Sequence, residues 1–165
     1  MLVQHSHCSF CGAAYQKNAP WPRVCRSCGE ITWRNPLPVG VALLPVIGTG
    51  GNGLVVVRRD IEPARGELAL PGGYMEIGET WREAIVRELR EETGIEAEAS
   101  TVRLFDLHSA PRSLQIFGLL PPMVPEGLPH RASRAEVMEW LIIEAPVELA
   151  FNTHTRAVVD YFASA

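Results

Sequence analysis

The chain has 165 residues, 47% of them hydrophobic, and a formal net charge of -4. This length fits one domain of ordinary size with room for a small appendage, and the hydrophobic content is sufficient for a core. The acidic charge argues against broad nucleic-acid binding, which normally requires a basic surface. No apolar run approaches the ~18 residues of a membrane span, and the N-terminus lacks a signal-peptide pattern. We therefore expect a cytoplasmic protein with no membrane partner.

The four cysteines lie near the N-terminus as two Cys-x2-Cys pairs, Cys8 with Cys11 and Cys25 with Cys28. Two such pairs, each followed by a glycine, are typical of a tetrahedral Zn²⁺ site with four thiolate ligands. Four protein ligands leave no open coordination position, so this zinc would be structural. Two disulfides are the alternative, which the missing secretory signal and the closeness of each pair disfavour.

Residues 35–38 read Asn-Pro-Leu-Pro, a stiff segment that predicts a domain boundary. We therefore expect a zinc ribbon over residues 1–34 and a second domain over residues 35–165. In the second domain, two apolar stretches separated by turn residues predict a hairpin, over residues 39–47 and 54–57, with Pro45 at an edge or a bulge. Further strands are expected over residues 96–107, 113–120 and 136–143, and a proline-rich loop over residues 121–129.

Local signals predict two helices. Thr80 followed by Glu83 forms a capping box, and Gly94 stands where a helix ends in a left-handed residue, so one helix should span the residues between them. Asn152 should cap a C-terminal helix. The side chains expected to face the core from that last helix are Val158, Val159 and Phe162. Strands and helices together imply an α/β fold whose sheet is covered on both faces.

The first helix carries Glu88, Glu91 and Glu92 at spacings i, i+3 and i+4, within an arc of about 100° on one face. Their side chains are therefore expected to converge, and Arg87 alone cannot neutralise all three. Clustered hard oxygen ligands suit Mg²⁺ or Mn²⁺. A solvated acidic helix face is the alternative, but it leaves unexplained the paired glycines at residues 72–73, which let the backbone approach an ion or a ligand closely.

The stretch from Gly73 to Ile95 matches G-x5-E-x7-R-E-U-x-E-E-x-G-U, with U aliphatic, at every position. A chance match in one register has a probability on the order of 10⁻⁸. This pattern is the signature of the Nudix hydrolases, and most of residues 8–95 resembles the members of that family that carry a zinc ribbon. The resemblance implies an α/β/α sandwich with a mixed sheet, preceded by a small N-terminal zinc ribbon.

The resemblance also implies roles for individual residues. The carbonyl of Gly73 would hold Mg²⁺ or Mn²⁺ together with the three helix glutamates, one or more of which would also act in catalysis. Arg87 would orient these glutamates, while Glu79 and Gly94 would be structural. Glu136 resembles a downstream glutamate that acts as the base in some relatives, although a plain surface role fits it equally well. Arg58 and Arg59 follow a predicted strand, and we expect them within reach of a substrate phosphate, with one of the two facing solvent instead.

The activity implied is hydrolysis of a nucleoside diphosphate linked to a second group, with ADP-ribose or a dinucleotide such as FAD as the small-molecule substrate. NADH is disfavoured, because residues 96–125 lack the motif that follows the signature in NADH pyrophosphatases. Removal of oxidised nucleoside triphosphates stays open, since those enzymes share the fold. A non-catalytic RNA- or protein-binding module is the alternative of another class. Many relatives are homodimers, and the sequence leaves this property open.

Overall fold

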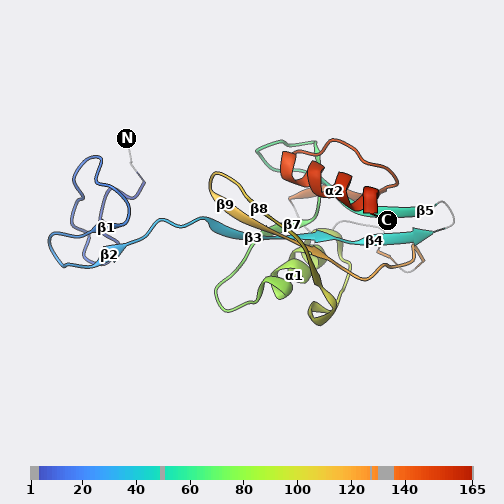
Figure 1. Ribbon diagram of the computed structural model, residues 1–165, viewed down its shortest axis with the longest axis horizontal. Coiled ribbons are helices and arrows are strands. Elements are labelled where there is room, and N and C mark those ends of the chain that lie inside the picture. The colour runs from blue at the N-terminus through green and yellow to red at the C-terminus, as the bar shows by residue number, and fades with distance from the viewer. Residues whose placement is uncertain (1–3, 49–50, 127, 130–135, 165) are drawn as a thin grey trace. The chain divides into compact units, whose positions relative to one another are not determined.

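The computed structural model describes residues 4–48, 51–126, 128–129 and 136–164, and the chain divides into two compact units, Met1–Pro36 and Leu37–Ala165 (Figure 1). Leu37 and Pro38, which we expected in the link, instead begin the strand β3 (Leu37–Leu43). Pro38 is tolerated there because it lies near the start of the strand and its carbonyl accepts from Met75 N at 3.1 Å.

Unit 1 has two short antiparallel strands, β1 (Arg23–Val24) and β2 (Ile31–Thr32). The hydroxyl groups of Tyr15 and Thr32 lie 2.6 Å apart and connect the first half of the unit to β2. Among the described residues of this unit, only Cys8 and Cys25 are buried. The unit is therefore organised around its cysteines and not around an apolar core.

Unit 2 contains two sheets. The first has the strand order β7–β3–β9–β8, in which β3 and β9 run parallel and the other pairs are antiparallel. Its remaining strands are β7 (Gly72–Tyr74), β8 (Arg103–Ser109) and β9 (Ser113–Leu119). The second sheet has the order β10–β5–β4, with β6 also paired to β5. Its strands are β4 (Pro45–Gly48), β5 (Gly51–Arg59), β6 (Leu68–Ala69) and β10 (Val137–Ile143).

The prediction of a single strand over residues 39–47 was wrong, because the chain passes from one sheet to the other at Leu44. Pro45 has no N–H to donate to a ladder, and it opens β4 at the edge of the second sheet. The carbonyl of Leu44 accepts instead from Val55 N at 3.1 Å. The hairpin therefore joins β4 to β5, with Pro45 opposite Leu54, while β3 belongs to the other sheet.

The strand predicted over residues 96–107 begins later than expected. A short 3-10 helix, η1 (Ala99–Thr101), occupies part of that range, and β8 starts at Arg103. The hydroxyl of Thr101 donates to the carbonyl of Glu98 at 2.7 Å, which favours the turn over an extended strand. The strands predicted near residues 113–120 and 136–143 are confirmed as β9 and β10.

Helix α1 (Trp81–Thr93) begins and ends where its local signals predicted. The capping box between Thr80 and Glu83 is complete, and Gly94 adopts a left-handed conformation with φ of 78°. Helix α2 (Asn152–Ser164) differs in two details. Asn152 is its first helical residue and not its cap. Val159 is 45% exposed, because the buried face is formed by residues at other positions of the turn: His154, Ala157, Val158 and Tyr161.

The two helices cover opposite faces of the first sheet, as Figure 1 shows, which confirms the α/β/α sandwich. Phe117 and Val41 pack in the core that includes Ala157 and Val158 of α2. On the other face, a side chain added at Gly40 would come within 2.9 Å of Ile85 of α1. Within the described residues, no helix is both long and apolar enough to cross a membrane.

Candidate functional site

Arg87 is the centre of a hydrogen-bond network on one side of α1. Its guanidinium donates to both carboxylate oxygens of Glu79, at 3.0 and 2.7 Å, and to Glu88 at 2.6 Å. Further bonds reach Glu91 at 3.3 Å and the carbonyl of Tyr74 at 2.9 Å. These bonds lower the pKa of Glu79 and raise the pKa of Arg87. Arg87 therefore fixes the orientation of the carboxylates, and its guanidinium donors are used in these bonds.

Glu92 lies on the same helix, but its carboxylate is bound by the backbone of β7 and not by Arg87. One of its carboxylate oxygens accepts from Gly72 N at 3.0 Å, and the residue is 8% exposed. Burial raises the pKa of Glu92 to about 8, and the charge of Glu88 acts in the same direction. A divalent cation beside this group would lower its pKa again.

The prediction that the three glutamates converge is correct for the helix face but not for their oxygen atoms. Glu88 and Glu91 turn toward Arg87, whereas Glu92 turns toward β7. The cysteine cluster of unit 1 is, among the described residues, the one cluster of potential metal ligands whose ligand atoms all lie close together. A shared ion would require the carboxylates to rotate by changes of side-chain rotamer.

The paired glycines before α1 are explained by close backbone contacts. A side chain at Gly72 would overlap the carbonyl oxygen of Gly40 on the neighbouring strand. A side chain at Gly73 would overlap the carboxylate of Glu88. The backbone of β7 is thus in contact with the acidic residues, so that main-chain and carboxylate oxygens are available side by side.

Two residues from other elements approach Glu92. The charge of Glu136, just before β10, raises the pKa of Glu92, and the charge of Arg59, at the end of β5, lowers it. Glu136 is exposed and its carbonyl accepts from Asp60 N at 2.8 Å. Sequence reasoning named Glu136 and Arg59 from separate motifs, and the antiparallel pairing of β5 with β10 brings them to the same end of the second sheet.

Arg58 and Arg59 are adjacent in sequence but differ in their contacts. Arg58 donates to Glu139 at 2.8 Å and to the carbonyl of Gly66 at 2.9 Å. Arg59 lies over the ring of Phe151, with its guanidinium carbon 5.0 Å from the ring centroid, and donates to the carbonyl of Pro63 at 3.0 Å. Of the two, Arg59 is the one whose charge acts on Glu92.

The donor set at this site fits Mg²⁺ or Mn²⁺. Its oxygens are hard ligands, and three carboxylates share the one guanidinium of Arg87. Burial raises the pKa of Glu92, and the charge of Arg59 does not offset this effect. Glu88, Glu91, Glu92 and the main chain at Gly73 are the groups that would hold such an ion.

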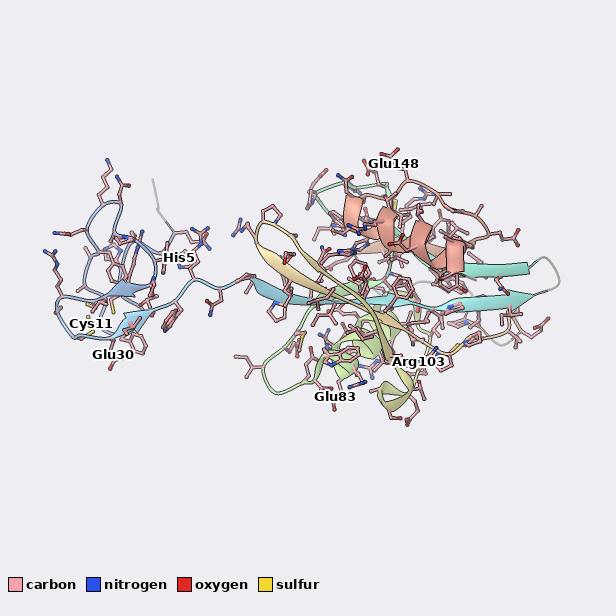
Figure 2. The ribbon with its side chains drawn as sticks, in the orientation of Figure 1. His5, Cys11, Glu30, Glu83, Arg103 and Glu148 are labelled. Atoms are coloured by element: carbon pink, nitrogen blue, oxygen red, sulfur yellow. The ribbon has the colours of Figure 1, made fainter. Side chains whose placement is uncertain are left out.

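The cysteines of unit 1 form a compact sulfur cluster, where Figure 2 labels Cys11. All four Sγ atoms lie within 4.8 Å of one another and no disulfide joins them. The Sγ atoms of Cys8 and Cys28 are 3.8 Å apart, close to the spacing expected for thiolates roughly 2.3 Å from a tetrahedral zinc. Backbone N–H groups of Cys11 and Phe10 lower the pKa of Cys8 to about 6. The donor set therefore fits zinc.

Sequence reasoning missed His154. This buried residue accepts a hydrogen bond from Leu70 N on Nδ1 at 3.2 Å, and its ring contacts Phe117 and Phe151. Burial, with the nearby charge of Arg59, lowers its pKa to about 3, so the ring is neutral at physiological pH. A histidine in a helix gives no local signal of such a contact, because its partners are distant in sequence.

The aromatic residues of the chain that could stack on a nucleotide base differ in their exposure. Phe117 is fully buried, Trp81 and Trp140 are partly buried against the apolar cluster under α1, and Trp33 of unit 1 is 60% exposed. A cavity of about 470 Å³ lies elsewhere, and none of its lining residues belongs to the acidic network. The acidic network, which contains the clustered carboxylates, is therefore the candidate site.

Comparison with known proteins identifies the second unit. Residues 36–160 match the model of the NUDIX domain. An ADP-ribose pyrophosphatase from Methanocaldococcus jannaschii is 42% identical over 116 residues, which cover 67% of this chain and 66% of the relative. An NAD-capped RNA hydrolase NudC from Escherichia coli is 24% identical over 95 residues, covering 57% and 35% of the two chains. The matched segments thus span less than two thirds of each of these curated relatives.

A crystal structure of a NUDIX hydrolase from Nitrosomonas europaea superposes with a TM-score of 0.76 and 22% identity, over 96% of this chain and 91% of that one. This likeness concerns the fold alone. The complete signature and the matched domain model, which covers most of the chain, together lead to one conclusion: the chain belongs to the NUDIX family.

Proposed function

We propose that the chain hydrolyses the diphosphate of a nucleoside diphosphate linked to a second group, with ADP-ribose as the leading substrate. The observation that carries this proposal is the junction of α1 and β7, where oriented carboxylates meet a backbone that only glycine permits. The named activity of the 42% identical archaeal relative supports the choice of ADP-ribose.

The acidic residues would bind and orient the cations. Mg²⁺ or Mn²⁺, when bound, offsets charge on the phosphate oxygens and lowers the pKa of the attacking water. Glu88, Glu91 and Glu92 supply the carboxylates, with the main-chain carbonyl of Gly73. Arg87 holds Glu88 and Glu91 in place through the bonds described above, and Glu79 in turn holds Arg87. Pre-oriented ligands reduce the reorganisation needed to reach the transition state.

Arg59 and Glu136 would contact the substrate. Arg59 is the cation whose field reaches Glu92, and a guanidinium suits a phosphate oxygen. Glu136 is exposed and its charge acts on the same carboxylate, so we assign it the proton of the attacking water. Water then adds across the P–O–P bridge, giving AMP and ribose 5-phosphate from ADP-ribose.

The test is a panel of ADP-ribose, FAD, NADH and nucleoside triphosphates with Mg²⁺ or Mn²⁺, with the products identified by mass. We expect ADP-ribose to give AMP, with no turnover when the divalent ion is omitted. Preferential cleavage of NADH would instead favour an NADH pyrophosphatase, and cleavage of an NAD-capped RNA would favour the activity named for the 24% identical NudC relative. Failure of every substrate would favour a non-catalytic binding module.

For unit 1 we propose one structural zinc held by Cys8, Cys11, Cys25 and Cys28. The four sulfurs already converge, and each Cys-x2-Cys pair ends in a turn at a glycine of positive φ, Gly12 or Gly29. The N–H groups of these glycines donate to the carbonyls of Cys8 and Cys25 at 3.0 and 2.8 Å. Because the site offers four ligands, we expect the zinc to take no part in the hydrolysis.

A further inference from the structure

Two partly buried side chains on neighbouring strands each have a buried polar atom that lacks a hydrogen-bond partner. Among the described residues, the buried side-chain atoms without one are His108 Nε2, Gln115 Oε1 and Trp140 Nε1. His108 Nε2 lies 3.0 Å from Asp106 Oδ2, which makes an ion pair only when the histidine is protonated, and this contact is not a hydrogen bond. Buried polar atoms in native proteins are normally paired, so two unpaired atoms on neighbouring strands call for an explanation.

His108 and Gln115 lie directly opposite each other, and they belong to one straight row across the first sheet. The pairing registers place Tyr74 opposite Val39, Val39 opposite Gln115, and Gln115 opposite His108. Strands are spaced by ~4.8 Å, so the row extends roughly 10 Å from β7 to β9 and roughly 14 Å from β7 to β8. An extended nucleoside monophosphate has a comparable length.

At one end of this row, the backbone of β7 contacts the acidic residues of α1. The carbonyl of Tyr74 accepts from Arg87, and Gly72, two residues earlier on the same strand, donates to Glu92. The Tyr74 side chain is 62% exposed and offers an aromatic surface, and Val39 offers an apolar one. The other end of the row, at Gln115 and His108, is polar and carries the two unpaired atoms.

The row lies beside the first turn of α2. Residues at alternate positions of a strand share a face, so Gln115 is on the same face as Phe117. The ring of Phe117 is 5.4 Å from that of His108 and 5.6 Å from that of His154. The charge of Arg59 acts on both His154 and Glu92. Ring contacts thus connect His108 to His154 through Phe117, and the charge of Arg59 is near enough to act on both His154 and Glu92.

We propose that Gln115 and His108 recognise the base of the substrate, and that they select an adenine by its 6-amino group. The amide oxygen of Gln115 accepts a hydrogen bond from the amino group, and His108 Nε2 pairs with an adjacent ring nitrogen. A 6-oxo purine presents an acceptor where the Gln115 oxygen requires a donor, so it is rejected. This inference rests on the proposed function, because it assigns a position to the nucleoside of that substrate.

The first experiment compares ADP-ribose with its hypoxanthine analogue, inosine diphosphate ribose, which differs at the 6-position of the base. We expect the wild type to prefer ADP-ribose by roughly 10- to 100-fold in kcat/KM. In Gln115→Leu, kcat/KM should fall for ADP-ribose and should not fall for the analogue, so the preference disappears. His108→Phe keeps a ring against Phe117 and should reduce the preference as well.

The matched control is Gln16→Leu, the same chemical change at an exposed position of unit 1. This variant should keep the wild-type preference. Thermal unfolding of all variants checks that unit 2 remains folded. Equal losses for both substrates in Gln115→Leu would overturn the inference, because they would indicate a structural role. An unchanged preference in Gln115→Leu would overturn it as well.

A binding measurement separates this inference from the proposed function. Calorimetric titration of the magnesium-loaded protein with AMP and with IMP requires no turnover. We expect AMP to bind more tightly, and Gln115→Leu to remove the difference. If this result were obtained with a protein that hydrolyses no diphosphate, the proposed function would fail and the base site would stand. Equal affinity of the wild type for AMP and IMP would refute the base site, even in an active enzyme.

Discussion

The two units of this chain bury very different amounts of apolar surface. In unit 1, Phe10, Val24 and Trp33 are all at least 60% exposed, and the buried side chains among its described residues are cysteines. In unit 2, Leu43, Leu54 and Phe117 are completely buried in apolar clusters. A chain of about 36 residues rarely buries enough apolar surface to fold alone. Unit 1 should therefore depend on metal, and unit 2 on its core.

The contrast extends to the ligands themselves. The sulfurs of unit 1 already lie together, at 3.6 Å between Cys11 and Cys25, and leave no position for a substrate. The carboxylates of unit 2 point to separate partners, Arg87 and Gly72, and are adjustable. A closed set of ligands suits a structural metal, whereas an open and adjustable set suits ions that take part in a reaction.

The largest effect should come from a zinc ligand. Cys25→Ser removes one thiolate, and structural zinc contributes ~10–16 kcal/mol of apparent binding free energy in small domains. We expect unit 1 to lose its zinc and its resistance to proteases, while the thermal transition of unit 2 moves little. Elemental analysis and limited proteolysis measure both effects.

The matched control for this experiment is Ser27→Ala, an exposed neighbour that supplies no ligand atom. It should retain one zinc per chain and an intact unit 1. Retention of zinc and protease resistance by Cys25→Ser would contradict the comparison, as would a wild-type protein that is free of metal and carries two disulfides.

The next largest effect should be on catalysis. Glu91→Gln removes a negative charge from a crowded face, so stability should stay unchanged or rise by a few tenths of a kcal/mol. Glu92, with its pKa raised to about 8, is mostly protonated near neutral pH, so Glu92→Gln removes little charge and should not lower stability either. In Glu92→Gln, the new side-chain amide still offers an oxygen to Gly72 N. With Mg²⁺ and substrate, the same changes should lower kcat by roughly 10²- to 10⁴-fold, because a ligand or base is lost.

Thermal unfolding in a chelator concentration that spares the zinc, together with steady-state kinetics, gives both quantities for each variant. Glu96→Gln makes the same change at an exposed residue beyond α1 and should affect neither. Near wild-type turnover of both Glu91→Gln and Glu92→Gln would show that the acidic face is not the catalytic centre.

A smaller effect concerns pH and the core of unit 2. The pKa of His154 is lowered from 6.5 to about 3, so the unfolded chain binds a proton in that range and the folded chain does not. The contribution of the neutral His154 ring to the stability of the folded state is complete above pH 6.5, and it is lost as the pH falls toward 3. When the pH is lowered from 7 to 5, protonation of His154 in the unfolded chain should reduce the free energy of unfolding by about 2 kcal/mol.

Denaturant unfolding of unit 2 at pH 7 and pH 5, in the wild type and in His154→Gln, isolates this contribution. Comparison with a variant is needed because Glu92, whose pKa is raised from 4.5 to about 8, contributes stability below pH 4.5 that is lost as the pH rises through 8. The difference between the two pH values should be smaller in His154→Gln. Equal differences in both proteins would mean that His154 is not responsible.

The smallest effect should distinguish two adjacent arginines. Arg58 and Glu139 form an exposed ion pair, with side chains 35% and 53% exposed, so Arg58→Ala should cost at most about 1 kcal/mol of stability. Arg59→Ala should lower kcat/KM for ADP-ribose more than Arg58→Ala does, because Arg59 is the residue whose charge reaches Glu92. Steady-state kinetics of the two variants, side by side, would reject this assignment if Arg58→Ala were the more impaired.

The sequence predicted best what depends on neighbouring residues. The capping box at Thr80, the left-handed Gly94 and the two Cys-x2-Cys turns each require only a few consecutive residues, and the structure contains all of them. The strand change at Pro45 was missed, because an apolar run looks the same whether it stays in one sheet or passes to another.

Some features of the candidate site also follow from neighbouring residues, whereas others depend on residues far apart along the chain. The acidic face of α1 follows from helical periodicity, and the contact of Gly73 with Glu88 agrees with the need for glycine there. The directions of the carboxylates, the buried His154, and the opposition of Gln115 to His108 depend on strand registers and on α2. No local pattern encodes these contacts, since their partners lie far apart along the chain.

The central claim is that the open acidic site of unit 2 performs the hydrolysis and the closed cysteine site of unit 1 does not. The most direct measurement uses protein that retains one zinc per chain and has been freed of other divalent ions, with ADP-ribose as substrate and products identified by mass. We predict no turnover until millimolar Mg²⁺ or Mn²⁺ is added, and then AMP and ribose 5-phosphate at constant zinc content. Turnover that follows the zinc content without added ions, or orthophosphate as the sole product, would contradict the account.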